Sequence, residues 1–379
     1  MNARDDFSDS FKPLCNISPT AFIALRDCAL KSLWFLSGKP PLLPTLPNAR
    51  AGTVVHRLLA EAGRGKLQSE RETISARWDE LIEQAHAEMN ASRSERHLVP
   101  LTRSVPRIEV LRIRAIQQAL EIVSTLRSPN PRPRPGRLRS GPRYGCEIHV
   151  KSADGLVRGV IDTVLPNEEG PVIRDYKSGS IFKTTGNDEY HLKEAYQIQL
   201  KIYAALYADS FDEWPTRLEI VPLSGEPYIV PFDRTDCTNL VEEARATLKR
   251  INKTLESHSK AFLKGLLANP TPGTCSYCEY RPACEPYWSA AIESGIDGWP
   301  LDVKGIVKDI KQLGNSKMML RLLTPSGLVN VPSLSADSRH PDLQAIQAGD
   351  TVGVFNLWRT RFTAPYSESH LTTIYKLDE

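Results

Sequence analysis

An acid and a lysine stand two positions apart in the stretch VIRDYKSGS, residues 172–180. The branched and aromatic residues around them predict a β-strand, and residues two apart in a strand project from the same face. Asp175 and Lys177 are therefore expected to share one pocket. Because burying two charges costs free energy, this strand indicates a site that binds charged groups.

Two further acids are expected near this pocket. Asp162 lies in the strand-like run RGVIDTVLP, and the short turn NEEG returns the chain to Asp175 on an adjacent antiparallel strand. Glu147, in the preceding run CEIHV, is a third acid that points the same way if the register holds. Carboxylates repel one another unless a hard cation lies between them, so Mg²⁺ or Mn²⁺ is expected there.

An acid cluster with one lysine is the chemistry of metal-assisted phosphodiester hydrolysis. Asp162 and Asp175 would place the ion, and the ion would lower the pKa of a bound water. Lys177 would orient that water and offset the phosphate charge. The pattern Asp-x-Lys alone carries little information, because chance produces roughly one occurrence in a few hundred residues. The prediction therefore depends on the whole set of residues.

The set resembles the PD-(D/E)xK nuclease superfamily and, within it, the RecB-like branch. Four motifs of that branch appear here in order, over a resemblance of roughly residues 17–290: GTVVH (52–56), GVID (159–162), DYK (175–177) and QLKIY (199–203). The resemblance implies that His56 completes the metal shell and that Gln199 and Tyr203 contact DNA phosphate or position the active site. Taken alone, His56 would be a partly buried polar residue, and the other two an amphipathic helix face.

Three cysteines, Cys275, Cys278 and Cys284, have the spacing C-x2-C-x5-C. Such close thiols, in a chain with an odd number of cysteines and no secretory signal, predict a metal site with zinc as the simplest ion. The local stretch offers no fourth ligand. In the AddB-type and CRISPR-associated spacer-acquisition nucleases that the chain resembles, an early cysteine, here Cys28, joins such a trio to hold a 4Fe–4S cluster. Zinc remains the alternative.

The order of elements indicates an α/β protein: a mixed β-sheet flanked by helices, a helical N-terminal region and a small all-β barrel at the C-terminus that looks like an OB fold. In the resembled family the sheet is a restriction-endonuclease-like core. We expect a flexible N-terminus (1–16), a nuclease domain (17–298) made of a helical part (17–127), a basic linker (128–143) and a catalytic core (144–298), and an OB-like domain (299–379).

Local signals give the main helices and the barrel strands. Ser18 and Pro19 predict the start of one helix that Gly38 closes. Further helices are expected at about residues 188–208 and 237–267. The last 80 or so residues predict five strands with a short helix between the third and the fourth. Aromatic residues of this region would either fill its core or stack on bases, namely Phe355, Trp358 and Tyr375.

The composition is that of a globular protein: 379 residues, 41% hydrophobic and 25% charged, with a net charge of +3. So small a net charge means that any basic surface must be local. The stretch 127–143 has six arginines, five prolines and no acid; it is either a solvated linker or a basic arm for phosphates. No apolar run reaches the length of a membrane span, so a cytoplasmic location without membrane partners is expected.

These observations predict a Mg²⁺- or Mn²⁺-dependent deoxyribonuclease that acts on single-stranded DNA or duplex ends in repair, recombination or antiphage defence. The chain has no G-x-x-x-x-G-K-[ST] motif, so unwinding would come from a helicase or defence-complex partner. One alternative is a catalytically silent, iron–sulfur-stabilised DNA-binding subunit, against which the intact acid–lysine set argues. Another is a zinc-ribbon structural protein.

Overall fold

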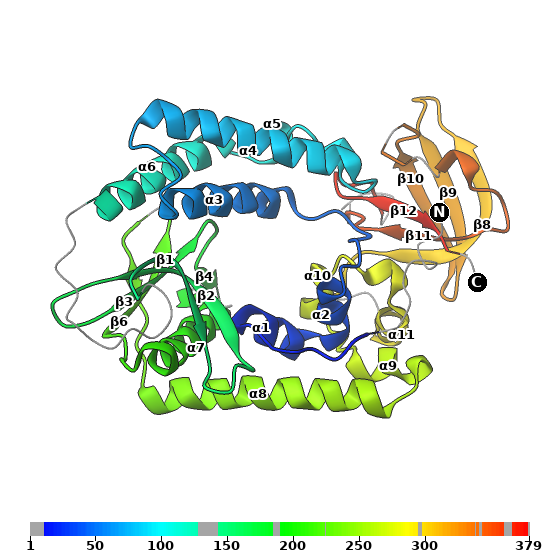
Figure 1. The fold of residues 1–379 in the computed structure, drawn as a ribbon. Helices are drawn as coiled ribbons and strands as arrows, with labels where there is room; N and C mark the ends of the chain where they lie inside the picture. Colours follow the sequence, from blue (N-terminus) through cyan, green and yellow to red (C-terminus); the bar gives the residue numbers. More distant parts are fainter. Residues whose placement is uncertain are drawn as a thin grey trace.

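The computed structural model describes residues 11–127, 143–184, 190–223, 225–294, 298–337, 339–340, 343–359 and 366–377. It has a helical N-terminal region, a mixed sheet with helices and a C-terminal antiparallel sheet (Figure 1). Residues 1–10 of the expected flexible N-terminus and residues 128–142 of the expected basic linker lie outside the described residues. None of the helices in the described part of the chain is long and apolar enough to cross a membrane.

The N-terminal region is helical, as predicted. Its longer helices α3, α4 and α6 pack against one another around a core of their own. On α4 the buried residues recur every three or four positions, which is the pattern of a helix with one face in a core. The helices are α1 (Pro19–Asp27), α2 (Ala29–Leu36), α3 (Pro47–Gly63), α4 (Arg71–Ala91), η1 (Arg96–Leu98), α5 (Leu101–Ser104) and α6 (Ile108–Arg127).

The expected single helix up to Gly38 is in fact two helices. Its start is confirmed: the Ser18 side chain accepts a hydrogen bond from the backbone N–H of Ala21, and Pro19 occupies the first turn. The prediction of one continuous helix is wrong, because Cys28 has an extended backbone (φ −159°, ψ 108°) that ends α1 and begins α2. No glycine or proline marks this break, so it has no local signal.

The mixed sheet has the order β1-β2-β3-β6-β7. Its first three strands form the predicted antiparallel meander, and β6 pairs parallel to β3 after the crossover helix α7. Ile173 of β3 belongs to the core that contains α1, α2 and α7, whereas Tyr176 belongs to the core of α3, α4 and α6, so the sheet separates α7 from those three helices. The strands are β1 (Gly145–Lys151), β2 (Arg158–Leu165), β3 (Val172–Lys177), β6 (Arg217–Pro222) and β7 (Tyr228–Ile229).

The later helices differ from expectation at their ends. The helix expected at 188–208 is α7 (Glu194–Phe211), because Tyr190–Leu192 forms strand β5 and pairs with β4 (Phe182–Thr184). The helix expected at 237–267 is two, α8 (Arg234–Ser257), capped by Asp233, and α9 (Lys260–Leu267). Short helices follow: α10 (Pro272–Ser276), η2 (Arg281–Ala283) and α11 (Glu285–Ser294).

The C-terminal region has the five predicted strands, with η3 (Leu343–Ala345) between the third and the fourth. The predicted barrel is wrong: the strand order is β10-β9-β8-β11-β12, and closure would need β10 to pair with β12, which does not occur among the described residues. The strands are β8 (Val303–Gln312), β9 (Met318–Thr324), β10 (Gly327–Leu334), β11 (Thr351–Phe355) and β12 (Thr373–Lys376).

Side chains at one end of this open sheet pack into the neighbouring core instead. Phe355 is fully buried, with its ring 5.5 Å from that of Trp288 on α11. Tyr375 is also buried, and its hydroxyl donates to the backbone carbonyl of Leu42. These two aromatic residues are therefore core residues and not base-stacking residues, whereas Trp358 is 67% exposed.

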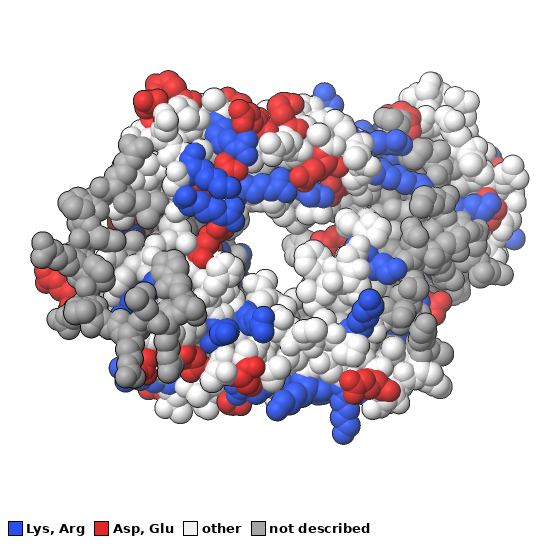
Figure 2. All heavy atoms as spheres, in the orientation of Figure 1, with Lys and Arg blue, Asp and Glu red and all other residues white. Residues whose placement is uncertain are grey.

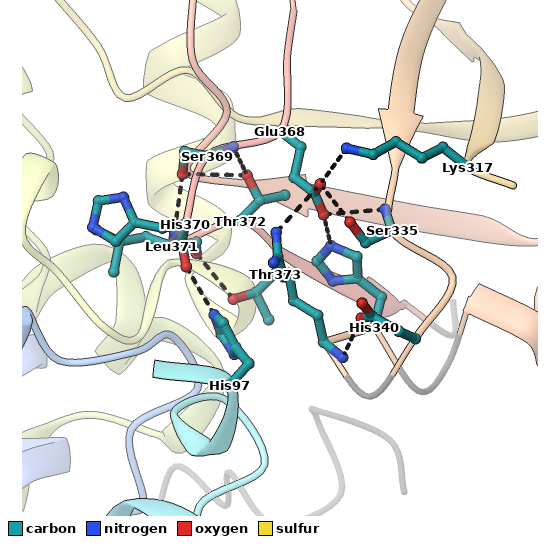
Figure 3. A network of polar contacts seen from close by, with 12 residues as sticks. His97, Lys317, Ser335, His340, Glu368, Ser369, His370, Leu371, Thr372 and Thr373 are labelled. Atoms are coloured by element: carbon teal, nitrogen blue, oxygen red, sulfur yellow. Dashed lines mark hydrogen bonds and ion pairs between the residues drawn. The ribbon is translucent and has the colours of Figure 1, made fainter. Parts of the chain in front are cut away.

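A polar network joins the last loop to the rest of the C-terminal sheet (Figure 3). The Glu368 carboxylate accepts from the Ser335 hydroxyl at 2.8 Å and lies 2.7 Å from Nε2 of His340. Burial by itself raises the pKa of Glu368, but the bonds from His340 and Ser335 lower it to about 2. Nearby, Nε2 of His97 lies 2.8 Å from the carbonyl oxygen of His370, so η1 contacts the same loop.

Candidate active site

Three acids occupy neighbouring positions across β1, β2 and β3. Thr163 pairs with Arg174, so the next position of this antiparallel register places Asp162 opposite Asp175. The β1–β2 pairs on either side of Glu147 place that residue beside Asp162. The short connections of the meander thus bring acids from three strands to one part of the sheet.

Asp162 and Asp175 are held by different groups. A carboxylate oxygen of Asp162 accepts the backbone N–H of Tyr176 at 2.9 Å, where the β2–β3 ladder ends. Asp175 is 3% exposed. Its Oδ2 lies 2.6 Å from Nζ of Lys177, although without the geometry of a hydrogen bond. This buried oxygen therefore keeps an unused acceptor site for a further ligand.

Lys177 lies at the end of β3 and is held from α7. Its Nζ donates to Oε1 of Gln199 at 3.1 Å and lies 4.6 Å from the ring centroid of Tyr196. Nε2 of Gln199 lies 3.5 Å from the hydroxyl of Tyr203. These three α7 residues have the spacing i, i+3, i+7 and share one helix face. The ammonium is thus fixed between the helix and the carboxylate of Asp175.

The glycines that begin the motifs GVID and GTVVH allow α7 and α3 to pack closely around the acids. A Cβ on Gly159 in β2 would lie 2.6 Å from the ring of Tyr203, so that ring packs directly on the strand backbone. A Cβ on Gly52 in α3 would lie 2.7 Å from Oγ of Ser178, the residue after Lys177. Both distances are shorter than van der Waals contact, so a larger residue would push α7 or α3 away from the acids.

His56 lies one helical turn after Gly52 and is exposed. Although this side chain touches solvent, the surrounding protein removes part of its hydration, and this loss lowers the pKa of His56. The charge of Lys177 lowers the pKa further, and the charge of Asp175 opposes this in part. The imidazole is therefore neutral at and above pH 7, which is the form that binds metal ions. His56 is thus close enough to Lys177 and Asp175 for their charges to act on it.

Asp162 is half-buried and Asp175 is buried, and the surroundings disfavour the ionised form of both carboxyl groups. Burial raises the pKa of Asp162 to about 7, and the charge of Asp175 contributes to the rise. Burial also raises the pKa of Asp175, against the opposing charges of Lys177 and His56. A hard divalent cation binds carboxylate oxygens and would stabilise both ionised forms. Asp162 and Asp175 therefore fit Mg²⁺ or Mn²⁺.

Glu147 has a different partner. Nη2 of Arg64 donates to its Oε1 at 2.6 Å, and Nε of the same guanidinium bonds the other oxygen. In the described part of the chain, no group of three or more His, Cys, Asp or Glu side chains is arranged to hold a metal ion. The role of Glu147 as a metal ligand stays a prediction, and the ion pair with Arg64 is a feature that the sequence did not signal.

The four cysteines lie around a single cavity: Cys28, Cys275, Cys278 and Cys284. The break between α1 and α2 brings the first of them to the other three, which follow in and after α10. Burial raises the pKa of Cys278 and of Cys284 to about 12, and for Cys284 the neighbouring thiols add to the rise. Buried thiols of this kind are stabilised as thiolates by a metal, so their chemistry fits one. Among the described residues, the four thiols are not arranged as a group of metal ligands.

Arg281 connects this cavity to the C-terminal sheet. Its guanidinium, 2% exposed, donates to the carbonyl oxygens of Cys275 at 3.0 Å and Cys278 at 2.9 Å. It also forms a buried ion pair with Asp302, at 2.7 Å, and Asp302 accepts from the Tyr287 hydroxyl at 2.8 Å. The cysteine segment and the residues entering β8 are thus held by one buried charge pair.

Some site residues escaped the sequence-based prediction. Tyr196 was not named, although its spacing of three from Gln199 on a helix could have indicated it. Arg64 and Ser178 were not named either, and only the folded chain brings them to the acids.

One of three comparisons with known proteins found a match. A family model described as the PD-(D/E)XK nuclease superfamily matches residues 16–285, which include the acids, the lysine and all four cysteines of the cavity. Searches of curated proteins and of solved structures found no match. Membership of this superfamily suggests a nuclease that hydrolyses phosphodiester bonds, and such nucleases typically use a divalent metal ion. The chain belongs to the PD-(D/E)XK nuclease superfamily.

Proposed function

We propose that the protein is a metal-dependent deoxyribonuclease that cleaves single-stranded DNA or duplex ends. The observation that carries the proposal is the position of Lys177: its ammonium lies 2.6 Å from the buried Asp175 and is fixed by Gln199, while Asp162 lies opposite on the next strand. Residues 17–298 would form the nuclease domain, and residues 299–379 an accessory domain.

Each residue then has a distinct role. Asp162 and Asp175 would hold the divalent ion, with neutral His56 as a further ligand from α3. When bound, such an ion polarises the phosphate and lowers the pKa of water. Lys177 would orient the attacking water and offset negative charge that develops on the phosphate, and Gln199 would keep the ammonium in place.

The shape and charge of the molecule support a nucleic-acid substrate with a free end. Figure 2 shows an opening through the molecule, with α3 on one side and α1 and α2 on the other, and with Lys and Arg as well as Asp and Glu side chains around it. α3 also carries His56. We propose that a strand reaches the acids through this opening, which a free end allows and a closed circle does not.

For the cysteine cavity we propose a 4Fe–4S cluster held by Cys28, Cys275, Cys278 and Cys284, with zinc as the less favoured ion. The support is that the four thiols converge from positions more than 240 residues apart, which would tie both ends of the nuclease domain together. Anaerobic purification tests this directly. Iron with a visible absorption band is expected, and a colourless protein with stoichiometric zinc would contradict the cluster.

We also propose a role for this cleavage in the cell. Cleavage of strands or ends is useful in DNA repair, recombination or antiphage defence, where a helicase or defence-complex partner would supply unwound DNA. No partner contact is required for the chemistry at the acids, so the isolated protein is expected to cut.

The deciding experiment compares one labelled DNA sequence as a linear strand and as a closed circle, with Mn²⁺ and with EDTA. We expect the linear strand to be degraded only with Mn²⁺, and the circle to be spared. Asp175→Asn and Lys177→Met should abolish cleavage while DNA binding persists. Matched controls are Asp212→Asn, at an exposed left-handed position that tolerates Asn, and Lys151→Met, exposed on β1. Binding without cleavage by the wild-type protein would instead identify a silent DNA-binding subunit.

A further inference from the structure

We propose that Arg64 and Glu147 form a counter-ion switch, meaning a pair that exchanges partners when the site is loaded. In the free protein the Arg64 guanidinium holds Glu147. When a divalent cation binds, Glu147 turns to the cation, and the released guanidinium binds a phosphate of the substrate. This inference rests on the proposed nuclease function and adds a residue to the site that no motif contains.

The contact itself is a fork that occupies both carboxylate oxygens. Nη2 of Arg64 donates to Oε1 at 2.6 Å, and Nε bonds Oε2. The side chains of Arg64 and Glu147 are 47% and 26% exposed, so water and ions reach the pair. An ion pair at this exposure contributes little to stability and exchanges readily for a stronger partner.

The position of Glu147 suits a residue that becomes a metal ligand only when a cation binds. It lies beside Asp162 across the β1–β2 ladder, next to a proposed ligand of the ion. Its backbone is left-handed (φ 52°), an unfavourable conformation for a residue with a side chain. Strain of this kind persists where the surroundings impose it, and it is concentrated at functional sites.

The end of α3 fixes Arg64 at this point. A Cβ on Gly63 would lie 2.5 Å from Cβ of Cys146, so the helix end is pressed against β1 immediately before Glu147. The same helix carries His56 about two turns earlier. One helix therefore presents both a neutral ligand and a guanidinium to the acids of the sheet.

The charges in this part of the sheet suit such an exchange. In the free protein Asp175 lies beside the ammonium of Lys177, and Glu147 is held by the guanidinium of Arg64. A dication bound by the acids would supply to Glu147 the positive charge that Arg64 supplies in the free protein, and would release the guanidinium. A phosphodiester carries one negative charge, and the planar guanidinium fork matches its oxygens.

The test measures Mn²⁺ binding by calorimetry in the full-length protein, without DNA. Arg64→Ala should bind Mn²⁺ more tightly than wild type, by about tenfold, because Glu147 no longer has a competing partner. The gain should vanish in Glu147→Gln, which cannot supply a carboxylate. With DNA present, Arg64→Ala should raise KM by about tenfold while kcat changes less, because a phosphate contact is lost.

A matched control is Arg77→Ala, which removes a similar two-bond contact with Glu61 (2.7 Å at each oxygen). Glu61 is not one of the three acids on β1, β2 and β3. It should change neither Mn²⁺ affinity nor KM. Unchanged or weaker Mn²⁺ binding by Arg64→Ala would overturn the switch, as would a gain that survives in the Glu147→Gln background. If the Mn²⁺ effects appear but no DNA is cut by any variant, the nuclease proposal fails while the exchange of Glu147 stands; if DNA is cut without the Mn²⁺ effects, only the switch fails.

Discussion

Replacing Asp162 by Asn should make the metal-free protein more stable at alkaline pH, although it removes a site residue. Asn has the same shape, and its carbonyl oxygen can still accept the Tyr176 N–H that Asp162 accepts at 2.9 Å. It carries no charge, so it avoids the cost of ionising a buried acid beside Asp175. A site residue that weakens the fold is expected where function requires a second partner.

The magnitude follows from the pKa of Asp162, which burial raises from 3.8 to about 7. Each pKa unit corresponds to about 1.4 kcal/mol, so roughly three units correspond to about 4 kcal/mol. Because the folded-state pKa is above the unfolded one, the native state binds more protons between pH 4 and 7. Wild-type stability therefore falls as pH rises through this window and is constant above it. Between pH 5 and pH 8 the advantage of Asn over Asp should grow by about 3 kcal/mol.

The assay is thermal unfolding of wild type and Asp162→Asn in EDTA at pH 5 and at pH 8. A gain in Tm of several degrees at pH 8, at about 2–4 °C per kcal/mol for a domain of this size, should shrink at pH 5. Asp212→Asn, at an exposed position, should show no such pH dependence. An Asn variant that is less stable than wild type at pH 8, or a difference that is equal at both pH values, would refute the reasoning.

Three further predictions follow from the same contacts. Mn²⁺ affinity should rise by up to about tenfold per pH unit below pH 7 and level off above it, because the proton of Asp162 must leave; calorimetry that shows no pH dependence would contradict this. Gly159→Ala should destabilise the protein by about 1–3 kcal/mol in thermal unfolding, since its Cβ would lie 2.6 Å from the Tyr203 ring, and an unchanged Tm would argue against that packing. Arg281→Met should destabilise the protein by about 3–5 kcal/mol, because it leaves the buried carboxylate of Asp302 unpaired, and should make the chain near Asp302 sensitive to limited proteolysis. A variant as resistant to the protease as wild type would show that the ion pair does not hold the C-terminal sheet.

The sequence predicted the parts of the site that are set by local pattern. Alternation along β2 and β3 and the short turn between them were enough to place Asp162 near Asp175. The spacing of Gln199 and Tyr203 placed both on one face of a helix that follows the strand. These features depend on contacts within a few residues or across one tight turn, so the periodicity of the side chains and the length of the turn are enough to predict them.

The parts that were missed depend on contacts between distant segments. Arg64 meets Glu147 only because α3 packs on β1, 83 residues further along the chain. The break at Cys28 has no local signal, and it serves a cavity shared with residues more than 240 positions away. The C-terminal strands were found, but whether β10 and β12 pair to close a barrel is a contact between strands far apart in the chain, which no local pattern determines.

The most direct test of the site is the single-turnover rate of DNA cleavage by wild type and Lys177→Met, at saturating protein and Mn²⁺. If the buried carboxylates and this ammonium act together on one phosphodiester, the rate should fall by about 10²–10³-fold in the variant while DNA affinity stays within a few-fold. Equal rates for the two proteins, or no Mn²⁺-dependent cleavage by wild type, would contradict the assignment of the active site.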